Sequence, residues 1–215
     1  MAWKDFNLFD FEREGFSHTF DEIVLPILDA SEQRFNQREQ EIDSEYDAAL
    51  LEESNEAERR DARGWAAYKQ TMLDEQREVI GAALLNVLCL AMKDSLESMS
   101  RYFKASHPAE DKYPGKSWLD KKQAEFKGRF QIDFQDAKEF SRVRELVLAR
   151  NASVHQNEGT LNEYREKVSE PRFLSDDGFL TFEKGPLVES FVDSNKFVEW
   201  VWCELDRIRI KSIPN

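Results

Sequence analysis

Cysteine and histidine are scarce in this chain. Its 215 residues include two cysteines and three histidines. Cys89 and Cys203 both lie in apolar helical patterns, where a free thiol usually behaves as a small hydrophobic side chain. The histidines share no spacing that would let them hold one metal ion. The sequence therefore indicates no disulfide framework, and we expect no metal site and no cofactor.

A long hydrophobic run is also missing. The longest apolar stretch, from Val79 to Met92, is interrupted by Asn86 and is too short to span a bilayer. The first residues, MAWKDFNLFDFE, combine acids with scattered aromatic residues and lack the cationic start and apolar core of a signal peptide. These features predict a soluble, cytoplasmic protein with no membrane partner.

Positive charge is in short supply. The chain has 30 Lys and Arg against 43 Asp and Glu, and a formal net charge of -13 argues against a broad nucleic-acid-binding surface. Between Arg101 and Arg129, however, eight bases face four acids. This segment predicts local contacts to RNA phosphates through five cations: Lys116, Lys121, Lys122, Lys127 and Arg129. A solvated surface loop is the alternative interpretation.

Glycine and proline are absent between Ser31 and Arg63. That segment holds eleven acids and five bases, and it has a thin apolar stripe at helical spacing, formed by Phe35, Ile42, Tyr46 and Ala49. The pattern predicts a long charged helix. Packing along one edge of the fold and a partner-binding coiled coil are both compatible with it. We expect residues 1–70 to form an N-terminal segment and charged helical arm that packs on a bundle formed by residues 71–215.

The remaining pattern is helical with one exception. The stretch from Trp65 to Phe103 predicts a central helix, because its middle is apolar on nearly every face. A short helix near Trp118, a helix from about Asp136 to Gly159 and a last helix from about Pro186 to Ile210 follow. The segment RFLSDDGFLTF has the alternation and turn of a β-hairpin. The expected fold class is all-α: an antiparallel helical bundle with a long charged helical extension and a small β-hairpin.

An arginine occupies an unexpected place in the helix expected over 136–159. Its apolar stripe runs through Phe140, Val143, Val147 and Val154, and Arg150 fills the gap in that stripe. A guanidinium at a position where the period calls for a buried side chain is costly unless it is paired or reaches a wet cleft. Arg150 therefore marks a candidate functional site.

Asn151 and His155 extend this candidate site, because they lie four residues apart on one helix face. A histidine can move protons near neutral pH, an arginine can bind phosphate oxygens, and Asn151 can orient the histidine or contact the substrate. Arg150 and His155 are about 140° apart on an ideal helix, so a long Arg side chain, a local break or a second subunit is needed to bring them together. A structural polar cluster is the alternative.

The string ELVLARNASVHQNEG resembles the RN-x-x-x-H signature of the HEPN superfamily of helical nucleotide-binding and RNA-cleaving domains. The segments SLESMSRYF, SWLDK and LSDDGFL also occur in the order typical of that family, and the resemblance covers roughly residues 70–210. It implies a bundle of HEPN type in which Arg150, Asn151 and His155 form the active site of a metal-independent endoribonuclease. It also suggests Glu97, on the central helix, as a supporting carboxylate for Arg150.

The same resemblance implies a function and partners. Many members are toxins or anti-phage effectors that cleave RNA by attack of a 2′-hydroxyl, commonly as homodimers. The alternative is a catalytically inactive HEPN-like module that binds a nucleotide or a protein partner. Asn157 stands where members inactivated by nucleotide transfer carry a tyrosine, so we do not expect that regulation, although an antitoxin or other regulatory protein remains a candidate partner. We expect a homodimer whose interface includes residues 150–159 and pairs the two motifs across a two-fold axis.

Overall fold

The computed structural model describes residues 15–52, 55–103, 112–155 and 157–211. Over these ranges the chain is mostly helical, which confirms the all-α class. The last helix begins two residues earlier than expected, and the central helix begins nine residues earlier. The elements are η2 (Phe20–Val24), α2 (Leu25–Glu52), α3 (Glu56–Tyr102), α4 (Trp118–Phe130), η3 (Phe134–Asp136), α5 (Phe140–His155), α6 (Glu158–Lys167) and α7 (Lys184–Lys211).

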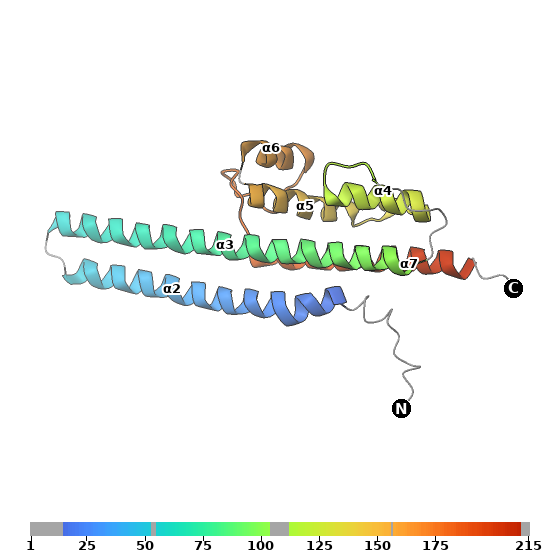
Figure 1. The fold of residues 1–215 in the computed structure, drawn as a ribbon. Coiled ribbons are helices and arrows are strands. Elements are labelled where there is room, and N and C mark those ends of the chain that lie inside the picture. Colours follow the sequence, from blue (N-terminus) through green and yellow to red (C-terminus); the bar gives the residue numbers. More distant parts are fainter. Residues whose placement is uncertain (1–14, 53–54, 104–111, 156, 212–215) are drawn as a thin grey trace, which may run out of the picture.

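Helix α3 forms the axis of the molecule, and the other long helices surround it. In Figure 1, α5 lies above α3, α2 lies below it and α7 lies behind it. Helix α5 runs antiparallel to α3, because Leu146 is near Cys89 and Arg150 is near Asn86. The bundle is nevertheless not antiparallel throughout, since α7 runs in the same direction as α3. Phe103, at the end of α3, packs edge-on against Trp202 late in α7, 5.2 Å between ring centroids.

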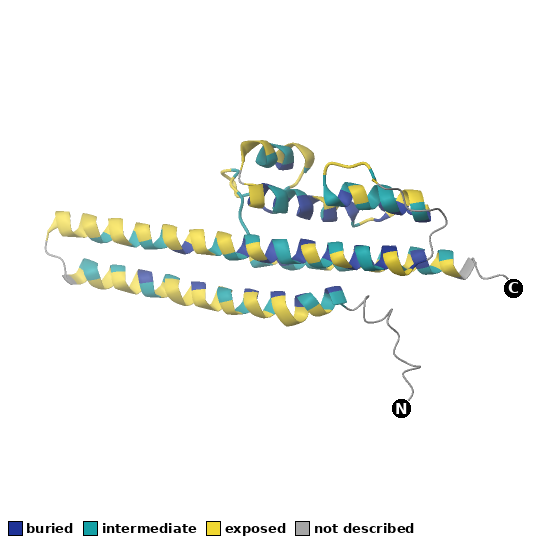
Figure 2. Cartoon of the chain, viewed as in Figure 1, coloured by how far each residue is buried: buried dark blue, intermediate teal, exposed yellow. Residues whose placement is uncertain are grey.

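The buried residues separate the bundle from the arm. Figure 2 shows buried positions gathered where α3 passes α5 and α7, whereas the outer half of the α2–α3 hairpin is mostly exposed. The buried core of that outer hairpin consists of Phe35, Ile42 and Leu73. Burying one such side chain contributes about 1.5–3 kcal/mol, so this small cluster stabilises the arm far less than the main core stabilises the bundle.

A glycine on α3 allows the chain to approach closely where the last helix begins. A Cβ atom at Gly81 would lie 2.1 Å from the Cβ atom of Phe182 and 3.0 Å from its carbonyl oxygen. Both distances are too short for non-bonded atoms, so the approach requires glycine. Phe182 thereby packs on α3 and also lies beside Phe173, with 5.9 Å between the ring centroids.

The expected β-hairpin is reduced to a tight turn. Leu174 and Leu180 form an isolated antiparallel bridge, and no strand occurs in the described part of the chain. Within the turn, Ser175 donates its N–H to Phe179 O at 2.8 Å, and Gly178 adopts a positive φ of 78°. The segment is thus a turn with a single bridge pair, and its two flanking segments are too short to form paired strands, so the expected β-hairpin is not confirmed.

Helix α3 is, within the described ranges, the helix that is long and apolar enough to cross a membrane by length and composition. The core helix of a water-soluble protein passes the same test. Here α3 packs against α2, α5 and α7, and these contacts account for its apolar side chains. This feature is weak evidence for a membrane span.

Candidate functional site

The helix that carries the motif is shorter than the sequence indicated. Helix α5 ends at His155, and Gly159 does not terminate it but lies in the first turn of α6. The reason is a capping residue: the side chain of Asn157 accepts a hydrogen bond from Thr160 N at 2.9 Å and begins the next helix. At the other end, the residues near Asp136 form the short helix η3, and α5 begins at Phe140.

Arg150 is held by two amide side chains. Its Nε donates to Asn86 Oδ1 at 2.9 Å, and its Nη1 donates to Asn151 Oδ1 at 3.2 Å. No carboxylate among the described residues forms an ion pair with it. The guanidinium is thus oriented by neutral acceptors and keeps its positive charge available for an anion.

Glu97 is not the partner of Arg150, which corrects the expectation from the sequence. Glu97 forms ion pairs with Lys93 at 3.7 Å and with Arg101 at 3.4 Å on its own helix. Asn86 precedes Glu97 by three turns of α3, which places the two side chains about 16 Å apart along the helix axis. The residue that sequence reasoning missed is therefore Asn86. Its signal was present, because Asn86 is the polar interruption in an otherwise apolar stretch.

His155 lies in the last turn of α5 and is exposed. Asn151 is one turn before it, and the bond from Arg150 Nη1 to Asn151 turns the guanidinium toward the side of the helix that carries His155. Of the three routes expected to bring Arg150 and His155 together, a break inside α5 does not occur, and the Arg150 side chain bonds to Asn86 and Asn151 rather than to His155. Val154, which the apolar stripe placed in the core, is 48% exposed, and Ala152 and Ser153 are buried instead.

The thiol of Cys89 lies near this cluster from the α3 side. Burial raises the pKa of Cys89 to about 12, and the charge of Arg150 opposes that shift only in part. The Sγ atom contacts the carbonyl oxygen of Leu146 at 3.9 Å. A thiol in this state stays protonated near neutral pH, so Cys89 serves as a packing residue.

The basic segment is largely neutralised by its own acids. Lys122 and Arg129 both pair with Glu125, at 2.8 and 2.7 Å, and Arg129 also donates to Ser100 Oγ at 2.6 Å. Lys127 pairs with Asp133 at 2.6 Å.

Among the five cations expected to bind RNA, Lys116 and Lys121 form no ion pair with another described residue. Both are exposed. The count of charges along the sequence therefore overstated the positive potential that this segment offers to a phosphate, because three of the five cations are paired with nearby carboxylates.

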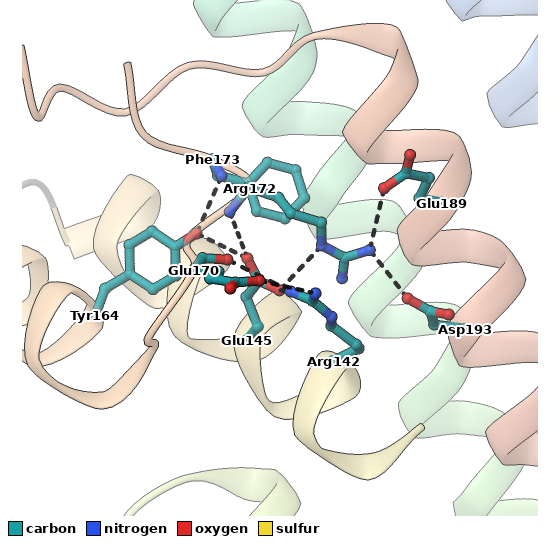
Figure 3. A network of polar contacts seen from close by, with 8 residues as sticks. All are labelled: Arg142, Glu145, Tyr164, Glu170, Arg172, Phe173, Glu189 and Asp193. Carbon is teal, nitrogen blue, oxygen red and sulfur yellow. Dashed lines mark hydrogen bonds and ion pairs between the residues drawn. The ribbon is translucent and has the colours of Figure 1, made fainter. Parts of the chain in front are cut away.

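A buried carboxylate holds α5 in place on the side away from the motif. Glu145 is 1% exposed and accepts hydrogen bonds from the backbone N–H of Arg172 at 2.7 Å and from its Nε at 3.0 Å. Arg142 Nη1 and the hydroxyl of Tyr164 also donate to Glu145, each at 3.2 Å. Figure 3 shows the network, in which Arg172 continues to Asp193 on α7 at 2.9 Å.

This network joins α5, α6, α7 and the segment between the last two. Burial raises the pKa of Tyr164, so its hydroxyl remains a donor to Glu145 while it accepts from Phe173 N at 3.1 Å. Sequence reasoning missed the network. Its signal was a single acid, Glu145, directly before the apolar residues Leu146 and Val147.

A separate cleft lies away from the motif. A cleft of about 640 Å³ separates the α2–α3 arm from the turn that precedes α7, and its lining includes Phe35, Arg77 and Phe182. None of the three motif residues lines it. The described residues contain no group of three or more His, Cys, Asp or Glu that would hold a metal ion.

The chain matches no protein-family model, no curated protein and no solved structure.

Proposed function

We propose that the protein is a metal-independent endoribonuclease of HEPN type that acts as a toxin or anti-phage effector in the cytoplasm. Arg150 binds a non-bridging phosphate oxygen, His155 transfers protons, and Asn151 positions both. The observation that carries the proposal is the state of Arg150. Its guanidinium is oriented by the side-chain amides of Asn86 and Asn151, and no carboxylate among the described residues pairs with it, so its charge is available to a phosphate.

The proposed reaction is a transesterification. A base removes the proton of the ribose 2′-hydroxyl, the 2′-oxygen attacks the neighbouring phosphorus, and the bond to the 5′-oxygen breaks as that oxygen takes a proton. The products are a 2′,3′-cyclic phosphate and a 5′-hydroxyl. Arg150 stabilises the extra negative charge that develops on the phosphate oxygens. His155 takes or delivers one of the two protons.

The proposal includes a homodimer with residues 150–159 in its interface, and RNA as the partner. An antitoxin or other regulatory protein that restrains the activity is part of the same proposal. Asn157 has a structural task as the cap of α6, which supports the expectation that it is not a site of covalent modification.

The test is cleavage of RNA by the purified chain, by two variants of the motif and by two control variants. Arg150→Ala and His155→Ala should each lose cleavage and growth inhibition, whereas Arg144→Ala and His18→Ala, at exposed positions, should retain both. Cleavage should continue in EDTA and leave 2′,3′-cyclic phosphate ends. Full activity of His155→Ala, or 5′-phosphate products that require magnesium, would remove the assignment.

One observation favours the alternative, a catalytically inactive module that binds a nucleotide. Lys122, Lys127 and Arg129 are paired with Glu125 and Asp133, which reduces the positive surface that could hold a long RNA, whereas one oriented arginine suffices for a single phosphate group. The same variants decide between the two. A module of this kind would bind a nucleotide through Arg150 and leave RNA intact.

A further inference from the structure

One side of α3 is left uncovered by the rest of the fold. At 100° per residue, Leu73 faces α2, Cys89 faces α5, and Gly81 faces the segment that leads into α7. The fourth side lies between α5 and α2 and points toward the viewer in Figure 1. We call it the open face of α3.

The open face carries large apolar side chains over most of its length. Trp65, Tyr68, Met72, Val79 and Leu90 fall within about 60° of one another around the helix and are 39–69% exposed. Trp65, Met72 and Val79 are seven residues apart, which is the spacing of a seam between packed helices. A contiguous stripe of this kind indicates a protein interface, because isolated exposed apolar residues would be scattered.

The stripe passes directly in front of the candidate site. Asn86 lies on it, so Arg150, which Asn86 holds, borders the stripe on the α5 side. Val154 is one turn beyond Arg150 and is 48% exposed. Five residues of α5 carry His155 about 7.5 Å from Arg150 toward the arm, to the level of Ile80.

We propose that the open face of α3 is an interface between two copies of this chain whose α3 helices pair antiparallel. The arm of each copy then brings its Tyr68 and Glu75 to the other copy's α5, at the end that carries Arg150 and His155. The apolar residues choose this register. When the two stripes are centred midway between Trp65 and Leu90, Trp65 faces Leu90 and Met72 faces Ala83, so both ends of the stripe are covered. A shift toward the motif leaves Trp65 and Tyr68 without an apolar neighbour.

Charge complementarity selects a second copy as the occupant. In this register Glu75 of the partner subunit lies opposite Ile80, at the level of His155, and on the same side of the stripe as α5. Glu75 is exposed and forms no ion pair with another described residue, and His155 has no carboxylate partner among the described residues. Each arm therefore supplies an unpaired acid to a site that lacks one.

The consequence for the site is specific. Tyr68 of the partner subunit lies over the Asn86 and Arg150 cluster, where its ring offers a surface for a base, and Glu75 of the partner subunit orients His155. The interface does not depend on the proposed ribonuclease activity, but the roles of Tyr68 and Glu75 in the site do. The arrangement also differs from a dimer in which two motifs meet, because each motif meets the partner's arm.

Cysteine cross-linking tests the register. In a Cys203→Ser background, with the buried Cys89 retained, a chain carrying both Trp65→Cys and Leu90→Cys should form a covalent dimer under mild oxidation. The two positions are about 37 Å apart on one helix, so a disulfide between them joins two chains. Each single variant should stay uncross-linked. A dimer through Val154→Cys alone would mean that the motifs meet each other, and would overturn the register.

Light scattering tests the interface itself. The full chain should be a dimer, and Val79→Asp should convert it to a monomer with an unchanged helical circular dichroism spectrum. Val192→Asp is the matched control, because Val192 is 40% exposed on α7, away from the open face, and the dimer should survive there. A monomeric parent chain, or a dimer indifferent to Val79→Asp, would overturn the proposal. Neither cross-linking nor light scattering requires RNA. A dimer that does not cleave RNA would therefore contradict the proposed ribonuclease activity but not the proposed interface.

Discussion

Arg150 and Asn86 are 64 residues apart in the sequence, and a 2.9 Å hydrogen bond from Nε to Oδ1 joins them across the α3–α5 contact. The acceptor is an amide, so the bond fixes the direction of the guanidinium and leaves its charge uncompensated. A carboxylate at the same place would bind more strongly and would compete with any phosphate.

Replacing Asn86 with Asp should therefore separate stability from activity. Asn86→Asp gives Arg150 a charged acceptor, so the free energy of unfolding should stay level or rise, while RNA cleavage falls by tenfold or more. Urea denaturation and a cleavage assay on the same preparation measure the two effects. Cleavage by Asn86→Asp at the parent rate would show that the charge of Arg150 is not used.

Removing the buried carboxylate of the network in Figure 3 should be among the most damaging single changes to stability. Glu145→Ala leaves Arg172 without its main partner in a site where the carboxylate is 1% exposed, and the expected loss is about 3–5 kcal/mol in urea denaturation. Glu170→Ala is the control. Glu170 is 85% exposed and reaches Arg142 only at 4.0 Å, so its removal should change stability by less than ~0.5 kcal/mol.

The pKa of Glu125 should make the α3–α4 contact sensitive to acid. Burial raises this pKa, but hydrogen bonds from Lys122, Ser100 and Arg129 outweigh it and hold the pKa below its ordinary value of 4.5. A carboxyl whose pKa is lowered by folding stabilises the fold above 4.5, and that contribution is lost as the pH falls through the lower, folded value.

Denaturation at a series of acidic pH values should show this dependence in the parent chain. Glu125→Gln cannot ionise, so its free energy of unfolding should fall less steeply over the same interval. An unchanged slope in Glu125→Gln would mean that other carboxyls account for the acid sensitivity.

The two thiols should differ in reactivity. Burial raises the pKa of Cys89 to about 12, whereas Cys203 is exposed on α7. A thiol reagent should therefore modify one cysteine quickly in the native protein and a second only after denaturant is added. Cys203→Ser should abolish the fast phase, and Cys89→Ser should abolish the slow one. Rapid modification of Cys89 in the native chain would contradict the packing of α3 on α5.

The sequence predicted most helices because long apolar periods survive in it, as in the stretch from Trp65 to Phe103. It failed at the end of α5, where a glycine suggested a terminus and the side chain of Asn157 instead started a new helix. Local signals of this kind compete, and tertiary packing decides between them. The direction of α7 relative to α3 could not be predicted either, because apolar periodicity does not show whether two packed helices run parallel or antiparallel.

The candidate site was predicted in part. Arg150 stood out because it broke an apolar period, and the structure confirms that it is partly buried and oriented. Its partner could not be read from the sequence, since choosing Asn86 over Glu97 depends on the axial level at which α5 crosses α3. The ion pairs of Lys122 and Arg129 with Glu125 were likewise hidden, although spacings of three and four residues on one helix favour them.

The start of the described chain packs on the last helix. Ser17 Oγ donates to Asn195 Oδ1 at 2.8 Å across 178 residues, and Phe20 stacks on Phe191 with 3.6 Å between ring centroids. The first aromatic residues of the core can therefore form these contacts only after the last helix has been synthesised. On a ribosome the helical hairpin of α2 and α3 can form early, but the scaffold that presents Arg150 closes only after α7 has left the exit tunnel. The chain therefore contains both helices of the Arg150–Asn86 bond before the last helix completes the core around them.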